Sequence, residues 1–170
     1  MNTLKTLVLA ALMLAPAALT ALDILGAFLA DTSGTPTNVR RQPRGKVAIT
    51  LPDTTSYMLT VGSPRDGWWQ LLYLEDAERA TEVSLPHSST GLWIHHSVLG
   101  VGTRNYGGER LHLRAAPGAA AKSIYSFTQE LTLHPLEVRR GWVRVVTTDG
   151  LHTGWIEEEM LCDNPLTNCC

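Results

Sequence analysis

A short apolar frame occurs twice along the chain. Residues 91–99 read Gly-Leu-Trp-Ile-His-His-Ser-Val-Leu, and residues 154–161 read Gly-Trp-Ile-Glu-Glu-Glu-Met-Leu. In both segments a glycine precedes a Trp-Ile pair, a polar bend follows, and a leucine closes the segment. The polar residues differ while the apolar frame is kept, and this predicts one small β unit that is built twice.

Other landmarks recur in the same order and at a constant spacing. In each of the following pairs the second number exceeds the first by 74: Val39 and Leu113, Arg40 and Arg114, Pro43 and Pro117, Gly67-Trp68 and Gly141-Trp142. The closing frame repeats at an offset of 62, as in Trp93 and Trp155 or Leu99 and Leu161. Because 74 exceeds 62 by 12, the first copy has 12 extra residues between its two tryptophan landmarks. Ordered landmarks at fixed offsets indicate two tandem copies of one unit.

Alternation of apolar and polar residues predicts short strands within each copy. Apolar and charged residues alternate in Val143-Arg144-Val145, as in a strand with one solvent-exposed face. Thr148-Asp149-Gly150 predicts a tight turn after this strand. The predicted strands are residues 46–51, 58–61 and 68–74 in the first copy and 123–127, 131–134 and 142–147 in the second. The sequence therefore predicts an all-β fold.

The extra residues of the first copy predict an extended hairpin. Residues 69–74 have a long strand pattern, the charged residues 75–79 form its turn, and residues 81–85 alternate again before Pro86 ends the hairpin. A short helix over residues 75–80 is the competing interpretation.

The N-terminus predicts export. A short polar start that contains Lys5 precedes the apolar residues 7–14, and the small residues 15–18 follow, as in a secretory signal peptide. We expect a signal peptide over residues 1–21, with Ala30 as a later cleavage alternative and an uncleaved anchor as the competing interpretation. After cleavage we expect no integral membrane span and a periplasmic or secreted protein.

All three cysteines lie in a C-terminal tail, residues 163–170, or directly before it. An exported chain meets an oxidising compartment, so Cys162 is expected to form a disulfide with Cys169 or Cys170, and the first pairing is our candidate. A metal site is the rival reading, but three thiols without a nearby histidine lack the spacing of a zinc motif.

Charge and motifs exclude several classes of function. The net charge is -2 at pH 7 and there is no basic block, so nucleic acid is a disfavoured partner. The cysteines do not lie beside a histidine, and Gly-x-Ser-x-Gly, His-Glu-x-x-His and phosphate-loop motifs are missing from the sequence. We therefore expect a protein that is not an enzyme, with no catalytic residues, no bound metal and no cofactor.

The aromatic residues and histidines supply candidate ligand contacts. Trp68 and Trp69 are neighbours on a predicted strand and point to opposite faces. Trp69 is therefore either a ligand contact or a residue packed under the long hairpin. Trp93 recurs as Trp155, which favours the core. Trp93 remains, with Trp69, His95 and Tyr106, in the candidate ligand-binding set. His95 and His96 alternate faces and cannot easily aim both rings at one ion, so hydrogen-bonded histidines are the simpler reading.

These motifs resemble those of the bacterial SH3-like domain. Asn38-Val39-Arg40-x-x-Pro43, the Gly-Trp landmark and the closing Gly-Leu-Trp-Ile frame carry the resemblance in the first copy. Leu113-Arg114-x-x-Pro117, Gly141-Trp142 and Gly154-Trp155-Ile156 carry it in the second. Exported tandem proteins of Bacteroidetes-type bacteria with a cysteine-containing tail are similar. The resemblance implies two small, strongly bent β-barrels and a non-catalytic role in binding cell-wall material or peptides.

Together these observations predict a domain plan and two rival functions. The first SH3-like domain covers residues 35–100, a short linker covers 101–110 and the second domain covers 111–162. The leading hypothesis is a module that binds a peptide, or peptidoglycan through its peptide, in an aromatic-lined groove. The alternative is a structural protein of the envelope that docks on a protein partner and has no small ligand. Because Glu157-Glu158-Glu159 replaces His95-His96-Ser97, the resemblance does not imply one ligand common to both copies.

Overall fold

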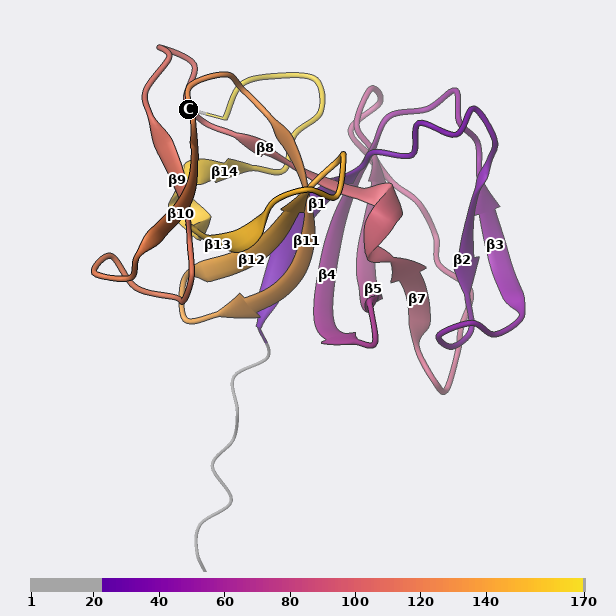
Figure 1. Cartoon of the computed structure of the whole chain (residues 1–170). Helices are drawn as coiled ribbons and strands as arrows, with labels where there is room; N and C mark the ends of the chain where they lie inside the picture. Colours follow the sequence, from indigo (N-terminus) through magenta and orange to yellow (C-terminus); the bar gives the residue numbers. More distant parts are fainter. Residues whose placement is uncertain (1–22, 170) are drawn as a thin grey trace, which may run out of the picture.

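The computed structural model describes residues 23–169 of the chain. Residues 1–22, which contain the predicted signal peptide, and Cys170 lie outside the described residues. The described chain is an all-β protein, which confirms the predicted fold class (Figure 1). Its two helical segments are short 3-10 turns, η1 (His96–Val98) and η2 (Glu158–Met160).

The strands fall into an N-terminal half, β1–β7, and a C-terminal half, β8–β14 (Figure 1). In the N-terminal half they are β1 (Ile24–Leu29), β2 (Thr37–Arg40), β3 (Val47–Leu51), β4 (Tyr57–Arg65), β5 (Trp68–Asp76), β6 (Thr81–Glu82) and β7 (Leu92–His95). In the C-terminal half they are β8 (Leu99–Thr103), β9 (Leu111–Arg114), β10 (Ser123–Phe127), β11 (Thr132–Arg139), β12 (Trp142–Thr147), β13 (Thr153–Glu157) and β14 (Leu161–Cys162).

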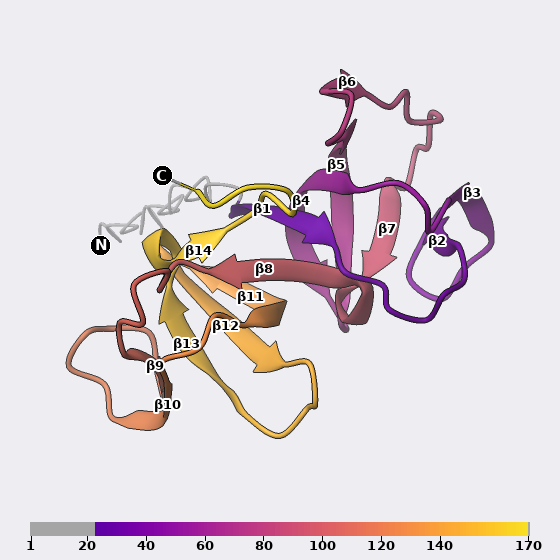
Figure 2. The ribbon, with the colours of Figure 1, turned by 90° about the horizontal axis from the view of Figure 1, so that it is seen from above.

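The strands form one continuous antiparallel sheet. Its order is β10-β9-β13-β12-β11-β8-β1-β4-β5-β7-β2-β3, with β14 paired to β8 and β6 paired to β5. This path is open at both ends, so the hydrogen bonding does not close either half into the separate barrel that the resemblance implies. Seen from above, the two halves lie side by side and β8 runs from one to the other (Figure 2).

Strand β8 belongs to both copies of the repeat. β1 pairs with β4 and β8, and β8 in turn pairs with β11 and β14. Phe28 lies opposite Gly100, and Gly102 lies opposite Cys162. The second pair follows the first by the repeat offsets, because 102 exceeds 28 by 74 and 162 exceeds 100 by 62. β8 is therefore the last strand of the first copy and the first strand of the second, and it contains residues 101–103 of the expected linker.

The repeat extends to single turns and hydrogen bonds. The β4–β5 and β11–β12 hairpins turn at Asp66-Gly67 and Arg140-Gly141, and all four residues have φ between 50° and 81°. Positive φ at both central positions is the geometry of a type I′ turn, which glycine accommodates without strain. The carbonyl of Gly67 accepts a bond from His96 N, and that of Gly141 accepts one from Glu158 N, each 2.9 Å long. Each 3-10 turn is thus fixed to the hairpin turn of its own copy.

The extra residues of the first copy form the predicted hairpin. β5 pairs with the two-residue strand β6, and Val83 N donates to the carbonyl of Leu74. The competing helix over residues 75–80 is not formed, because the Asp76 carboxylate accepts bonds from the backbone N–H groups of Glu78 and Arg79 and pairs with the Arg79 guanidinium. These local bonds hold a turn.

One apolar core runs through both halves. Buried side chains from the N-terminal half, such as Leu25, Val61 and Leu74, belong to the same cluster as Leu133, Val143 and Val145 of the C-terminal half. Trp69 of β5 is among the fully buried residues of this cluster. The two halves are therefore joined by side-chain packing as well as by the shared strand.

Candidate functional site

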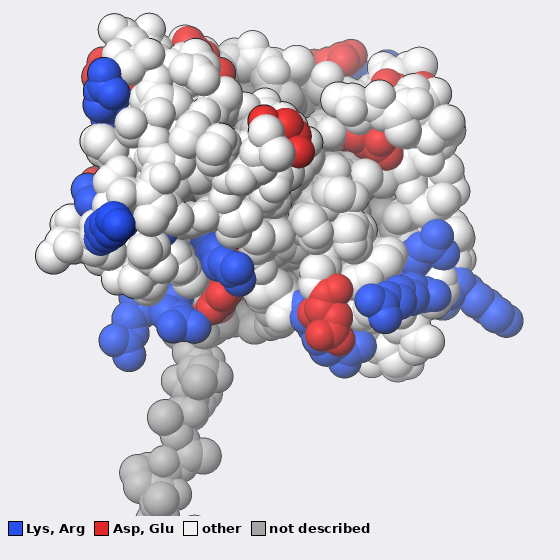
Figure 3. Space-filling view, viewed as in Figure 1, with Lys and Arg blue, Asp and Glu red and all other residues white. Residues whose placement is uncertain are grey.

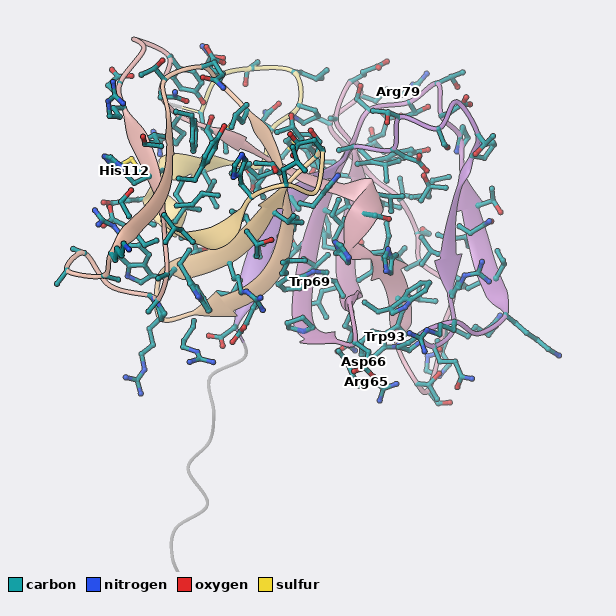
Figure 4. All side chains as sticks on the ribbon, viewed as in Figure 1. Arg65, Asp66, Trp69, Arg79, Trp93 and His112 are labelled. Atoms are coloured by element: carbon teal, nitrogen blue, oxygen red, sulfur yellow. A yellow bond between two sulfur atoms is a disulfide. The ribbon has the colours of Figure 1, made fainter. Side chains whose placement is uncertain are left out.

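Trp69 was a candidate ligand contact, and the structure contradicts that prediction. Its exposed fraction is 0%, and its indole Nε1 donates to the carbonyl of Pro135, 2.9 Å away, in β11 of the other half. Figure 4 shows Trp69 where the two halves meet. A side chain without exposed surface cannot contact a ligand, so Trp69 is a packing residue, and its hydrogen-bond partner is Pro135 of the other half and not the long hairpin. Trp69 packs at the junction of the two halves.

Trp93 is also largely buried, at 8% exposure. Its Nε1 donates to the carbonyl of Thr90, and the Arg65 guanidinium lies 5.1 Å from the centre of its ring (Figure 4). The second copy repeats the arrangement, with Arg139 5.6 Å from the ring of Trp155. A cation held over an indole face in both copies is a structural contact of the unit, and it leaves Trp93 little surface for a ligand.

His95 and His96 lie against other rings and do not form an open site. The His95 ring is 5.1 Å from Trp68 and 4.4 Å from His96, and His95 Nδ1 is hydrogen-bonded to the hydroxyl of Ser97. His96 in turn lies 6.5 Å from His134, which β11 supplies. The three histidines thus form a cluster at the junction of the two halves.

The surroundings of His95 and His96 favour neutral rings at these two positions. Burial lowers the pKa of His95, and Arg44 and His134 lower it further. Burial, followed by the neighbouring His95 and His134, lowers the pKa of His96 to about 4. His96 Nδ1 is buried and has no hydrogen-bond partner among the described residues. A charge on His96 would therefore be poorly solvated.

Tyr106, the last candidate of the set, lies elsewhere, beside the C-terminal tail. Its hydroxyl accepts a bond from Cys169 N, 3.0 Å away. The predicted disulfide is confirmed, and it joins Cys162 to Cys169. Tyr106 is therefore not part of a surface with Trp93 and His95, and the predicted set does not form one aromatic groove.

A different aromatic surface is open in the C-terminal half, around Trp142. Two hollows, of about 180 and 530 Å³, meet at Trp142 and Glu157, and together we call them the Trp142 groove. The first is lined by Arg110, Leu111, His112, Arg114, Trp142, Ile156, Glu157 and Met160. The second is lined by Ala119, Gly141, Trp142, Glu157, Glu158 and Glu159. The half-buried indole thus lies between a basic wall of Arg110, His112 and Arg114 and an acidic wall of Glu158 and Glu159, and Glu157 lines both hollows.

The elements of the repeat explain why this groove is open. Trp68 and Trp142 begin the equivalent strands β5 and β12. In the first copy Trp68 is only 9% exposed, and the His95 ring packs against it in a T-shaped contact. The second copy has Glu157 in place of His95, and Trp142 is half-buried instead of covered. The substitution opens the equivalent face and adds a carboxylate to it.

The electrostatics of the groove are mixed. Burial, and then the charge of Asp23, raise the pKa of Glu158 above its ordinary value. On the opposite wall His112 Nδ1 is hydrogen-bonded to the hydroxyl of Ser123, and His112 lies on the outer side of the C-terminal half (Figure 4). Figure 3 shows that, on the face drawn there, Lys and Arg side chains gather along the lower edge of both halves and leave much of the surface uncharged.

Sequence reasoning used Trp142 only as a repeat landmark. The signal that could have found the groove is the loss of His95-His96-Ser97 in the second copy, which removes the ring that covers the equivalent tryptophan.

Two features are absent from residues 23–169. They contain no group of three His, Cys, Asp or Glu side chains arranged to hold a metal ion. No helix in this part of the chain has the length and hydropathy needed to cross a membrane.

Comparison with known proteins gives only distant structural similarity. No protein-family model and no curated protein matches the chain. Among solved structures it is similar to NlpC1 from Trichomonas vaginalis, with 11% identity, a TM-score of 0.29, and coverage of 85% of this chain and 47% of that one. NlpC2 from the same organism gives 13% identity, a TM-score of 0.30, and coverage of 84% and 48%. The chain thus spans about half the length of these proteins. Similarities at these TM-scores assign neither family nor function.

Proposed function

We propose that this chain is an exported, non-catalytic binding module made of two SH3-like units that share β8. We place its ligand site at the Trp142 groove and infer that the ligand is a peptide, including the peptide of peptidoglycan. The observation that carries the proposal is the half-buried Trp142 indole, with Arg110 and His112 in one hollow, Glu158 and Glu159 in the other, and Glu157 lining both.

The composition of the groove suits a peptide. The indole face supplies apolar contact area at a small entropic cost, as aromatic side chains do at binding surfaces. A peptide with an amine side chain and a free carboxylate carries both charges that the two walls complement, and such complementarity fixes orientation. A polyanion such as nucleic acid would meet the acidic wall and be repelled.

The compartment is part of the proposal. The Cys162–Cys169 disulfide is compatible with an oxidising environment, where exported proteins fold. The two SH3-like units are supported by the repeated turns, 3-10 segments and arginine–tryptophan contacts of the two halves.

The test is retention of the purified, oxidised protein on purified cell-wall sacculi, with calorimetric titration of a synthetic stem pentapeptide that carries one amine and a free carboxylate. We expect the wild-type protein to be retained. Trp142→Ala should weaken binding about tenfold or more, as truncation of a central interface aromatic commonly does. Leu151→Ala is the matched control, because Leu151 is 75% exposed and lines neither hollow.

A charge-reversal variant, tested with a peptide in its free and acetylated forms, distinguishes loss of a groove contact from unfolding. Glu157→Lys should weaken binding of the amine-bearing pentapeptide and should weaken binding of the same peptide with its amine acetylated much less. Equal affinity of wild type and Trp142→Ala, or no retention of the wild type on sacculi, would overturn the proposal. The remaining hypothesis would then be the structural envelope protein, in which the buried Trp69 and Trp93 serve packing alone.

A further inference from the structure

The C-terminal tail covers a second pocket, which shares no lining residue with the Trp142 groove. It has a volume of about 350 Å³ and lies between the central strands β1, β8 and β11 and the disulfide loop. β1 and β8 supply Phe28, Gly102 and Thr103 to its wall, and the tail supplies residues 164–168. Tyr106, from the sequence-predicted ligand set, is also part of its lining. We call it the tail pocket.

The tail that closes this pocket is fixed at several points. Cys162 is paired with β8 through β14 and is bonded to Cys169. The side-chain oxygen of Asn164 accepts bonds from the backbone N–H groups of Leu166 and Thr167, 2.9 and 3.2 Å away. The Tyr106 hydroxyl accepts the bond from Cys169 N, so its own proton remains available to a further acceptor. The pocket wall is therefore formed before any ligand arrives.

The repeat shows that this loop replaces a strand. In the first copy the chain continues from Leu99 and Gly100 through β8 into the second half. The equivalent residues Leu161 and Cys162 form β14, which stops after two residues, and Asp163-Asn164-Pro165 follows where β8 has Val101-Gly102-Thr103. Proline cannot donate to a strand ladder. The chain thus leaves the sheet and closes over the space beside Phe28.

The chemistry of the lining selects a class of ligand. Phe28 and Tyr106 are half-buried rings that offer apolar faces. Thr132, Asn164 and Thr167 offer hydroxyl and amide groups, and Glu130 offers a carboxylate. No Lys, Arg or His of residues 23–169 lines the pocket, so an anion would find no counter-charge among them. Aromatic faces combined with many uncharged hydrogen-bonding groups suit a ligand with C–H faces and several hydroxyl or amide groups.

We propose that the tail pocket binds a neutral oligosaccharide, which lies on the rings of Tyr106 and Phe28 and is held by the disulfide-closed loop. This site is independent of the proposed peptide site. The Tyr106 hydroxyl donates to a sugar oxygen, while the Asn164 amide and the Thr132 hydroxyl bond the sugar's polar groups. Reduction of Cys162–Cys169 by an external dithiol forms two thiols on the protein and a disulfide in the reductant, and it frees the loop that completes the pocket.

The test is calorimetric titration of the oxidised full-length protein with two probes, triacetylchitotriose and maltotriose, together with saturation-transfer NMR. We expect at least one probe to bind. Tyr106→Ala should weaken that binding about tenfold, and Thr132→Val, a milder change on the same wall, should weaken it severalfold. Trp142→Ala should leave it unchanged, which separates this site from the peptide groove.

Reduction gives a second readout that does not depend on substitution. Dithiothreitol should weaken saccharide binding severalfold, while a Cys162→Ser, Cys169→Ser double variant should bind weakly with or without reductant. Circular dichroism must show that each variant stays folded. If neither sugar binds, if Trp142→Ala alone abolishes binding, or if the pocket takes the stem pentapeptide and no sugar, the proposal is overturned.

Discussion

Trp68 and Trp69 are adjacent in the sequence, and each has a different role in the structure. Trp68 packs against the His95 ring, and Trp69 points the other way and bonds to Pro135 of the opposite half. Alternation along a strand predicted the opposite faces, since successive side chains of a strand always diverge. It could not predict which face meets the other half, because that depends on how two distant segments pack.

Replacement of Trp69 tests its role at the junction. Trp69→Phe keeps most of the apolar ring but removes the indole N–H, so the buried carbonyl of Pro135 loses its partner. We expect a loss of about 1–3 kcal/mol in the free energy of unfolding, measured by urea denaturation. Trp142→Phe is the matched control and should change stability by less than about 1 kcal/mol, because Trp142 is half-buried and makes no such bond within residues 23–169. Equal effects of the two changes would contradict this role.

The histidine cluster predicts a pH dependence of stability. The pKa of His96 is lowered in the folded state to about 4 from 6.5, so the unfolded chain binds a proton that the folded protein excludes. The contribution of neutral His96 to the free energy of unfolding is therefore fully present above pH 6.5 and is lost as the pH falls towards 4. The urea midpoint should decrease across this window, with a contribution in the same direction from His95, whose pKa is also lowered.

A variant isolates the contribution of His96. His96→Gln should make the decrease of the urea midpoint between pH 6.5 and 4 shallower, because the glutamine side chain does not take up a proton in this range. The exposed residue His87 supplies the control, and His87→Gln should leave the pH profile as it is in wild type. A profile that does not change in His96→Gln would show that the cluster does not govern acid stability.

At the scale of elements, the sequence predicted the strands that recur in both copies and missed the shared strand β8 and its neighbour β1. The Gly-Trp landmarks and closing frames correctly marked the beginnings of β5, β12, β7 and β13. β8 was assigned in part to a linker because Gly100 and Gly102 interrupt its apolar pattern. Gly100 is needed there, since a Cβ at this position would lie 2.6 Å from a ring carbon of Phe28. β1 was missed because its apolar residues follow directly on the predicted signal region.

The position of β1 makes a prediction about the N-terminus. β1 lies between β4 and β8, and it buries Leu25 and Ala27 in the core. A chain that starts at Asp31, as late cleavage at Ala30 would leave it, should be less stable by about 3 kcal/mol or more than one that starts at Asp23. Thermal melts of the two chains measure the difference. If the chain is exported as proposed, N-terminal sequencing of the mature protein should place its first residue before Ile24, and a mature chain that begins at Asp31 would refute this.

At the scale of the molecule, a shared strand and a shared core make the two repeats one folding unit. β8 pairs with β1 of the N-terminal half and with β11 and β14 of its own, and Trp69 of one half bonds to Pro135 of the other. Tandem domains joined by a linker would unfold separately. Here separation would leave the edge of β8 unpaired and expose Trp69, so the halves should not populate independent folded states.

Cooperativity can be tested by weakening each half in turn. Val61 in β4 and Val145 in β12 are fully buried, one in each half. Val61→Ala and Val145→Ala should each lower the midpoint of a single calorimetric transition by several degrees, with equal calorimetric and van't Hoff enthalpies in wild type and both variants. Independent domains would instead give two transitions, and each substitution would move only its own. Each valine belongs to only one half. If either substitution shifts the whole transition, the cooperative unit is the entire sheet and not the single repeat.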